Sequence, residues 1–435
     1  MIKIPEYSRR RQQLMSMVGE GSIVILRAAP HRIRNSDVYY PYRQDSDFLY
    51  LTGFREPEAM LVLVPGGKHG TSILFCRERD PKKEIWDGAM LGTEGAVANL
   101  GMDEAYPISE MERRLPELLR DRIRVFHDLG RDVDFDHLLI GWLNDFRGKP
   151  RRTFHAPEEI VDLGHLLHEM RLFKSRGELS AMRRAGRISA EAQNRAMRTC
   201  RPGLNEAQIH AELVHEYMSH QCEPAYPPIV GGGANACVLH YTDNNQPLEE
   251  GDLLLIDAGC EYDGYASDIT RTFPVNGRFS GEQRALYEVV LTAQERAIDA
   301  VREGAQWDDL HDVAVEALTD GLLDLGILDG DREAAIEQGL FENYYLHKTG
   351  HWLGLDTHDV GDYQVDGHSR ALETGMVLTI EPGIYIRSDD EQVDPRWRGL
   401  GIRIEDDVVV TRDEPEVLSR GVPKAMDDIE ALMGE

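Results

Sequence analysis

Cysteine is scarce in this sequence, with five residues among 435. Their number is odd, they are widely separated, and no two form a CxxC pair: Cys76, Cys200, Cys222, Cys237 and Cys260. A disulfide framework or a zinc ribbon needs paired and closely spaced cysteines. The sequence therefore predicts reduced thiols and a cytoplasmic protein, because thiols stay reduced in that compartment.

Long apolar runs are also missing. No stretch approaches the roughly 20 consecutive apolar residues of a membrane-spanning helix. The opening residues, MIKIPEYSRRRQQLMSMVGEGSIVIL, include no apolar segment of signal-peptide length. The hydrophobic fraction of 41% and the charged fraction of 29% are those of an ordinary globular protein. We expect neither insertion into a membrane nor secretion.

Positive charge is in deficit. Lys and Arg number 48 against 77 Asp and Glu, which gives a formal net charge of −29. Such a surface repels phosphate backbones, so the composition argues against nucleic-acid binding. Most of the excess is explained by a solvated acidic coat, while a minority of the carboxylates could carry chemistry.

The chain is long enough for two or three domains. Its first 170 or so residues mix short strands and helices without a Gly-rich phosphate loop. Apolar β-branched runs predict strands at 22–26, 59–65, 71–76 and 123–129, and helical spacing predicts helices at 108–121 and 135–146. This pattern predicts an α/β domain over residues 1–173, followed by a second domain over residues 174–435.

The second domain combines helices with strand pairs. Ser175 with Glu178 and Ser280 with Gln283 form capping boxes at the heads of two long helices. Asn205 begins another helix, and WDDLHDVAVEALTDGLLDLG has the spacing of a fourth. Between and after these helices, the sequence predicts that strand 252–258 pairs with 266–273 and that 376–385 pairs with 401–410. This arrangement indicates an α+β domain.

The strand pairs contain an internal repeat. GDLLLIDAG (251–259) aligns without a gap to GMVLTIEPG (375–383), which matches Asp257 to Glu381. Each half adds a second acid on its return strand, Asp268 and Glu405, and a histidine upstream: His240 in the first half and His358 in the second. Chance similarity of two apolar strands is the alternative. The matching acids in the matching register instead favour two halves related by a pseudo-two-fold axis.

These four carboxylates need cations. A buried carboxylate without a partner is very costly, and four brought together would repel one another strongly. Two divalent ions would balance the charge of Asp257, Asp268, Glu381 and Glu405. Oxygen-rich ligation suits Mn²⁺ or Mg²⁺, and one added imidazole shifts the preference towards Mn²⁺, Co²⁺ or Zn²⁺. The sequence predicts a site for two divalent metal ions, with Mn²⁺ favoured.

Histidine candidates lie in LHKTGHWLGLDTHDVG (346–361). His347 and His351 stand four apart, as two ligands on one helix face would. Gly350 and Gly354 argue against a helix there, and no glutamate follows His347 as in HExxH. A structural role for this pair is therefore the alternative. The density of histidine and glycine beside an aspartate favours a loop at a functional site.

Taken together, these motifs resemble a known family. IDAGCEYDGYASDITRTFPV, HWLGLDTHDVG, LTIEPGIYI and GIRIEDDVVV resemble the dinuclear metallopeptidases of the pita-bread fold, and among them aminopeptidase P, the Xaa-Pro aminopeptidase. YPYRQDSDFLYLTGFREPEAMLVL is similar to that family's N-terminal domain, and MRLFKSRGEL to its inter-domain junction. Methionine aminopeptidases lack such an N-terminal domain, and creatinases lack the metal carboxylates. The resemblance implies an α/β N-terminal domain followed by an α+β pita-bread catalytic domain with a pseudo-two-fold internal repeat.

The resemblance also implies a role for each metal ligand. Asp257 would bind one metal only, Asp268 and Glu405 would bridge the two ions, and His351 with Glu381 would complete the other. One position departs from the family, which often has glycine after the histidine that matches His347, where this chain has Lys348.

The implied reaction is amide hydrolysis by a hydroxide that bridges the two metals, because coordination lowers the pKa of water towards neutrality. Glu381 would carry the proton from that water to the leaving nitrogen. His240 and His358 would donate hydrogen bonds to the carbonyl oxygen as it becomes tetrahedral. The alternative for these two histidines is an ordinary structural role in loops.

Substrate selection would depend on shape, because an Xaa-Pro bond has no N–H. The residues that the resemblance assigns to substrate binding are His347, Tyr385, Arg403 and Trp86. In similar enzymes the tryptophan reaches the active site of a neighbouring subunit, which implies a homo-oligomer, a dimer or a tetramer. Arg403 could alternatively serve only to neutralise the carboxylate beside it.

Two other functions compete with Xaa-Pro aminopeptidase activity. Prolidase has the same fold and ligands but acts on Xaa-Pro dipeptides, and a group that captures the dipeptide carboxylate would mark it. A non-catalytic binding protein of this fold would have lost metal ligands, whereas all five are present here. The sequence therefore favours an aminopeptidase that acts on peptides beginning Xaa-Pro, with no role for nucleic acid or membrane.

Overall fold

The computed structural model describes residues 2–149 and 153–434 and divides into two compact units, Met1–Met170 and Arg171–Glu435. The sequence places the boundary at about residue 173. Arg171 and Lys174 belong to the second unit, where both side chains form ion pairs with the buried Asp359. Each unit has its own hydrophobic core.

The first unit is built on a six-stranded sheet with the order β6-β5-β4-β1-β7-β8. Its strands are β1 (Ser22–Arg27), β4 (Met60–Val64), β5 (Thr71–Cys76), β6 (Glu104–Pro107), β7 (Arg124–Phe126) and β8 (Glu159–Val161). β1 pairs antiparallel with β4 and parallel with β7, so the sheet is mixed. The short hairpin of β2 (Ile33–Asn35) and β3 (Val38–Tyr39) lies outside it.

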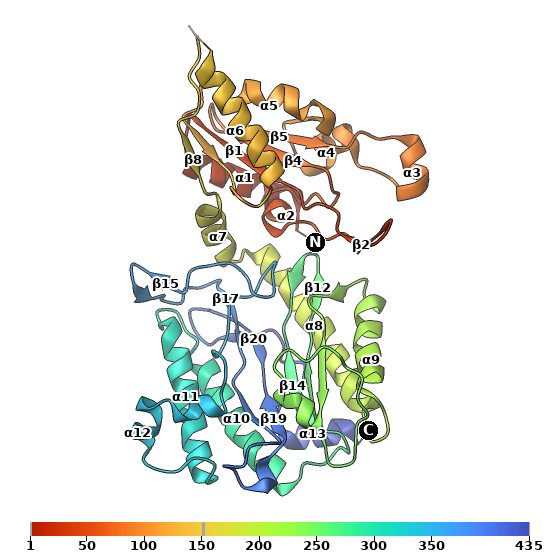
Figure 1. The fold of residues 1–435 in the computed structure, drawn as a ribbon, viewed down its shortest axis with the longest axis vertical. Helices are drawn as coiled ribbons and strands as arrows, with labels where there is room; N and C mark the ends of the chain where they lie inside the picture. Colours follow the sequence, from red (N-terminus) through yellow and green to blue (C-terminus); the bar gives the residue numbers. More distant parts are fainter. Residues whose placement is uncertain (1, 150–152, 435) are drawn as a thin grey trace. The chain divides into compact units, whose positions relative to one another are not determined.

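Helices surround this sheet (Figure 1). They are α1 (Ile4–Val18), α2 (Ser46–Thr52), α3 (Pro81–Asp87), α4 (Gly92–Leu100), α5 (Met111–Leu119), α6 (Val133–Gly148) and α7 (Gly164–Leu172). Leu115 of α5 and Leu139 of α6 are fully buried against the apolar side chains of β1, β4 and β5. The predicted α/β architecture of the first domain is confirmed.

In the second unit, two helix pairs flank the central strands. α8 (Arg176–Thr199) packs on α9 (Glu206–Ser219), and α10 (Gly281–Ala300) packs on α11 (Trp307–Asp324). Figure 1 shows the two pairs on opposite sides of the strands. The predicted caps at Ser175, Asn205 and Ser280 are all present, each with a reciprocal capping box. The short α12 (Arg332–Glu337) and α13 (Met426–Met433) complete the helices of this unit among the described residues.

The strands repeat the same pattern twice. In the first half, β11 (Leu253–Asp257) pairs with β14 (Thr270–Pro274), and β12 (Cys260–Tyr262) pairs with β13 (Tyr265–Ala266). In the second half, β17 (Val377–Ile380) pairs with β20 (Asp406–Val409), and β18 (Gly383–Ile386) pairs with β19 (Leu400–Arg403). All four pairings are antiparallel. This duplication is the predicted pseudo-two-fold repeat.

The sequence prediction was wrong about the continuity of three of these four strands. Each of the three is two short strands with a break at its acidic residue, whereas predicted strand 252–258 is the single strand β11. Asp257 is the last residue of β11, while Asp268, Glu381 and Glu405 lie between two strands. Ala266 pairs with Glu261 of β12 instead of continuing into β14. The backbone hydrogen bonding between paired strands therefore ends at each of these acidic residues.

Three glycines of the repeat occupy positions where a side chain would not fit or would be strained. Gly251 and Gly375 precede the matching strands with φ of +93° and +97°, in the left-handed region that favours glycine. Gly259 follows Asp257 where a Cβ atom would lie 1.7 Å from the Ser267 carbonyl oxygen. The turn after Asp257 therefore has no room for a side chain.

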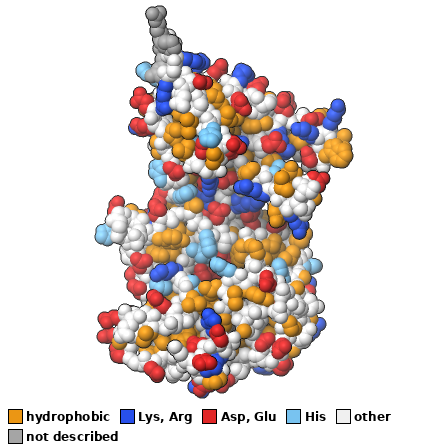
Figure 2. All heavy atoms as spheres, in the orientation of Figure 1, with side chains coloured by type: hydrophobic (Ala, Val, Ile, Leu, Met, Phe, Trp, Pro, Cys, Tyr) orange, Lys and Arg blue, Asp and Glu red, His pale blue; other side chains and the backbone are white. Residues whose placement is uncertain are grey.

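Acidic side chains are scattered over most of the visible face and do not form a single patch (Figure 2). Across residues 2–149 and 153–434, no helix has both the length and the apolar character that crossing a membrane requires.

Candidate metal centre

All five predicted ligands meet at one cavity of about 210 Å³ in the second unit. Its lining also includes three further predicted site residues, His240, His347 and His358, together with Arg403. Tyr385 is buried beside it and hydrogen-bonds to two of the lining residues. Trp86 lies on α3 of the first unit, with a side chain that is 87% exposed, and does not line this cavity.

The ligand atoms are close enough to share cations. One atom from each of Asp268, His351 and Glu405 lies within 4.8 Å of the others. His351 Nε2 is 3.4 Å from Asp268 Oδ2 and 3.5 Å from Glu381 Oε1. Asp268 and Glu405 are buried, since they come from the breaks between strands described above.

His351 presents its Nε2 atom to the carboxylates. Its Nδ1 lies 2.9 Å from the Trp352 carbonyl oxygen, which can only accept, so Nδ1 carries a proton. A histidine whose second nitrogen donates to a carbonyl is oriented as a metal ligand usually is. Burial lowers the pKa of His351, but the Asp268 hydrogen bond and the Glu381 charge outweigh it and raise the pKa to about 9. Nε2 therefore has a strong affinity for a proton or a cation.

The carboxylates carry more negative charge than their surroundings neutralise. Burial raises the pKa of Glu381 to about 7, and the charges of Asp268 and Asp257 add to this. Burial also raises the pKa of Glu405 well above its ordinary value, with Asp268 as the next cause. Arg403 donates from Nη2 to Asp257 Oδ2 at 2.6 Å but does not balance four acids. The set is chemically suited to divalent cations.

Three neighbours that sequence reasoning missed hold the carboxylates in place. The Tyr226 hydroxyl lies 2.6 Å from Asp257 Oδ1 and also hydrogen-bonds to Asp268. Thr270 Oγ1 donates to Glu405 Oε2 at 2.6 Å. The Asp268 backbone N–H donates to the Asp407 carboxylate at 3.1 Å. Tyr226 lies in PAYPPIV, far from every motif, and no pattern in the sequence marks it.

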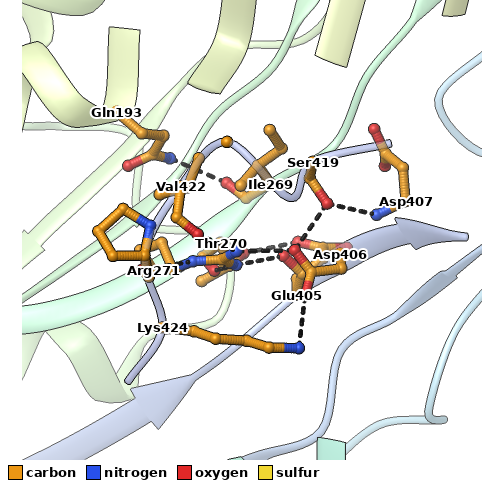
Figure 3. A network of polar contacts seen from close by, with 12 residues as sticks. Gln193, Ile269, Thr270, Arg271, Glu405, Asp406, Asp407, Ser419, Val422 and Lys424 are labelled. Atoms are coloured by element: carbon orange, nitrogen blue, oxygen red, sulfur yellow. Dashed lines mark hydrogen bonds and ion pairs between the residues drawn. The ribbon is translucent and has the colours of Figure 1, made fainter. Parts of the chain in front are cut away.

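A buried network supports Glu405 from behind (Figure 3). Arg271 donates to the Glu405 carbonyl oxygen at 2.6 Å and to the Asp406 carboxylate at 2.7 Å. Asp406 also accepts hydrogen bonds from Ser419 and Lys424 at 2.6 and 3.1 Å. Burial would raise the pKa of Asp406, but Arg271 and Lys424 hold it below its ordinary value. Of the three consecutive acids Glu405, Asp406 and Asp407, only Glu405 lines the cavity.

Hydrogen bonds orient His347 over the cavity. Its Nδ1 donates to the Lys348 carbonyl oxygen at 2.8 Å, and its Nε2 lies 2.8 Å from the Tyr385 hydroxyl. Arg403 donates to that hydroxyl at 2.9 Å, so Tyr385 donates its own proton to His347. Burial, with the Arg403 charge, lowers the pKa of His347 to about 4. His347 is therefore neutral, and the segment 347–351 is an irregular loop with bends rather than a helix.

His240 and His358 are exposed residues of two loops at the cavity. The His358 ring lies 4.2 Å from the His351 ring, centroid to centroid. Partial desolvation of the ring at the cavity, with the His351 charge, lowers the pKa of His358. The next residue, Asp359, is buried and accepts from Lys174 Nζ at 3.0 Å and from Arg171. This ion-pair cluster anchors the loop that presents His358.

The sequence matches two family models. Residues 180–412 match the metallopeptidase family M24, and residues 7–126 match the aminopeptidase P N-terminal domain. The chain therefore belongs to metallopeptidase family M24, which implies dependence on a divalent metal. Both matches together place it in the aminopeptidase P group of that family, which confirms the resemblance and the pita-bread fold.

Full-length relatives agree with this assignment. The chain is 46% identical to the Xaa-Pro aminopeptidase of Escherichia coli (strain K12), over 98% of its own length and 97% of the relative's. It is 37% identical to human Xaa-Pro aminopeptidase 3, over 99% of its own length and 86% of the relative's. Among solved structures, Pseudomonas aeruginosa aminopeptidase PepP matches with a TM-score of 0.98 and 52% identity, over 100% and 98% of the two chains. A Zn-substituted E. coli aminopeptidase P in complex with product has a TM-score of 0.97 and 46% identity over the same shares.

Proposed function

We propose that this metallopeptidase releases the first residue from peptides with proline in second place. The observation that carries the proposal is the convergence of five metal-binding side chains with His347, Tyr385 and Arg403 at one cavity. The relatives named Xaa-Pro aminopeptidase, which the chain matches over nearly its whole length, support the same activity.

The proposed cofactor is a pair of divalent ions, with Mn²⁺ favoured. Asp257 would hold one ion, Asp268 and Glu405 would bridge both, and His351 with Glu381 would hold the other. The fit rests on the close approach of these side chains, the orientation of His351 Nε2 and the excess negative charge of the set. When bound, the ions lower the pKa of water so that a hydroxide nucleophile is available near neutral pH.

The protein side chains complete the reaction. Glu381 lines the cavity among the proposed ligands and would carry a proton to the leaving proline nitrogen. His240 and His358 reach the cavity from two loops and donate hydrogen bonds to the oxygen that becomes negative. His347, Tyr385 and Arg403 form a connected wall against which the proline ring packs.

The proposed enzyme is a homo-oligomer in which Trp86 acts across a subunit boundary. Trp86 is 87% exposed within its own chain, so a large apolar side chain faces solvent. Contact with a neighbouring copy would bury this side chain. Trp86→Ala should leave unfolding unchanged within about 0.5 kcal/mol, as surface changes usually do, yet reduce kcat/KM on Xaa-Pro peptides.

The cytoplasmic location stays a prediction.

The experiment that tests this function compares kcat/KM under one Mn²⁺ loading. The substrates are Xaa-Pro-Yaa, Xaa-Ala-Yaa, acetyl-Xaa-Pro-Yaa and the Xaa-Pro dipeptide. We expect fast release of Xaa from the first peptide only. Efficient cleavage of the dipeptide with little cleavage of the tripeptide would instead identify a prolidase.

A further inference from the structure

A second cavity of about 710 Å³ adjoins the metal cavity in the same unit. Lys348 and Gly350 line both of them. The lining of the second cavity includes the buried apolar side chains of Leu310, Leu378 and Ile380. The proposed reaction does not use this cavity, and its mixture of apolar and polar lining residues suits a ligand pocket.

Lys348 is the single cation among the described residues that line the second cavity. Its side chain is exposed, and no ion pair of it is found among the described residues. Burial lowers the pKa of His311, and the Lys348 charge lowers it further. Burial raises the pKa of Asp312, and the Lys348 charge acts in the opposite direction. Both residues line the second cavity, and Lys348 lines that cavity as well as the metal cavity.

The polarity of a bound peptide matches this charge distribution. Its N-terminal amine is a cation and belongs in the acidic metal cavity, with proline against His347. An extended peptide advances about 3.3 Å per residue. Since His347 and Lys348 are consecutive residues of the cavity lining, we place the residue after proline beside Lys348. A tripeptide ends there in a carboxylate. Arg403, the other cation lining the metal cavity, is buried and already paired with Asp257.

We propose that Lys348 binds the C-terminal carboxylate of a tripeptide substrate and that the second cavity receives the side chain of its third residue. This inference rests on the proposed function and names the substrate that the site prefers: Xaa-Pro-Yaa with a free carboxylate and an apolar third residue. Asp308 and Asp312 on the cavity rim repel an acidic third residue. Trp307 and Tyr363, whose rings lie 4.6 Å apart, supply an aromatic wall for an apolar one.

Steady-state kinetics of the Mn²⁺-loaded full chain on Xaa-Pro-Leu and Xaa-Pro-Leu-amide test the carboxylate contact. We expect the wild type to prefer the free acid and Lys348→Met to raise KM for it about three- to five-fold, the size of an exposed ion pair. The variant should leave kcat unchanged and the amide unaffected, and Lys348→Arg should restore the preference. Lys68→Met, an exposed lysine of the first unit, is the matched control for the loss of one charge.

A second arm tests the cavity. Gln364 is exposed on its rim, so Gln364→Trp fills space without disturbing the core. This variant should weaken selection of Xaa-Pro-Leu over Xaa-Pro-Gly and leave Xaa-Pro-Gly turnover unchanged. An acid-to-amide ratio that is the same in wild type and Lys348→Met overturns the Lys348 assignment alone. A wild type that cleaves neither tripeptide nor amide, yet cleaves the dipeptide, overturns the proposed function and this inference with it.

Discussion

At the residue scale, the proposed metal centre depends most on Asp268. It is buried, and its carboxylate lies near both His351 and Glu405. Asp268→Ala should therefore lower bound metal below stoichiometric amounts and reduce activity by more than the roughly 10–100-fold typical of losing a supporting residue. Metal analysis and kcat on the same preparation check this, with the exposed Asp243→Ala as control. Full activity in Asp268→Ala would contradict the ligand assignment.

The two loop histidines should behave differently from the ligands. His240→Ala and His358→Ala should keep their metal while kcat falls about 10²–10³-fold, the usual loss of one donor to a developing oxyanion. Either variant purifying without metal would show that its histidine is a ligand instead.

At the element scale, the buried Arg271–Asp406 pair joins β14 of one half of the repeat to β20 of the other. Asp406→Ala leaves the Arg271 guanidinium buried without its counter-charge, which costs about 3–5 kcal/mol. Urea unfolding should show that loss together with weaker metal binding. Arg332→Ala removes an exposed cluster of ion pairs with Glu316 and Asp320 and should leave the free energy of unfolding almost unchanged, because solvent screens exposed ion pairs. A similar small loss in both variants would show that the network does not support Glu405.

Gly350 offers a second element-scale test. A Cβ atom there would lie 1.9 Å from the carbonyl oxygen of Thr379 in β17, so the two segments can approach only through glycine. Gly350→Ala should push His351 away from the carboxylates and weaken metal binding, as metal titration would show. Gly367→Ala, where open space surrounds the Cβ position, controls for the loss of a glycine, although its positive φ adds strain.

Elements with local signals were predictable, and those set by distant contacts were not. The helices that begin at Ser175, Asn205 and Ser280 start where their caps predict, because a capping box is encoded within four residues. The repeat gave the four acids directly. The strand breaks were not foreseen, because apolar alternation continues through Glu381 and Glu405 while the backbone departs there from the ladder. Such departures from local rules are expected at functional sites.

At the scale of the whole molecule, the centre should link stability to pH. Glu381 has a pKa of about 7 in the folded chain against 4.5 as its ordinary value, so the folded state binds the extra proton between these values. Stability is then lost as pH rises from about 4.5 through 7. The pKa of His351 is raised from 6.5 to about 9, so the loss of stability continues as the pH rises through that range. Chelated protein should show a falling Tm from pH 5 to 8, and added Mn²⁺ should raise Tm most at pH 8. A flat profile would contradict the charge assignment.

The Arg271–Asp406 network also bears on when, during synthesis of the chain, the metal centre can form. All five predicted ligands have been synthesised once the ribosome passes Glu405, yet Ser419 and Lys424, which hold Asp406, are still to come. The first unit contains its whole sheet by Val161 and can fold well before that. We therefore expect a chain truncated between Glu405 and Ser419 to carry every ligand and still bind metal weakly, so that peptidase activity begins only after Ser419 and Lys424 have been synthesised.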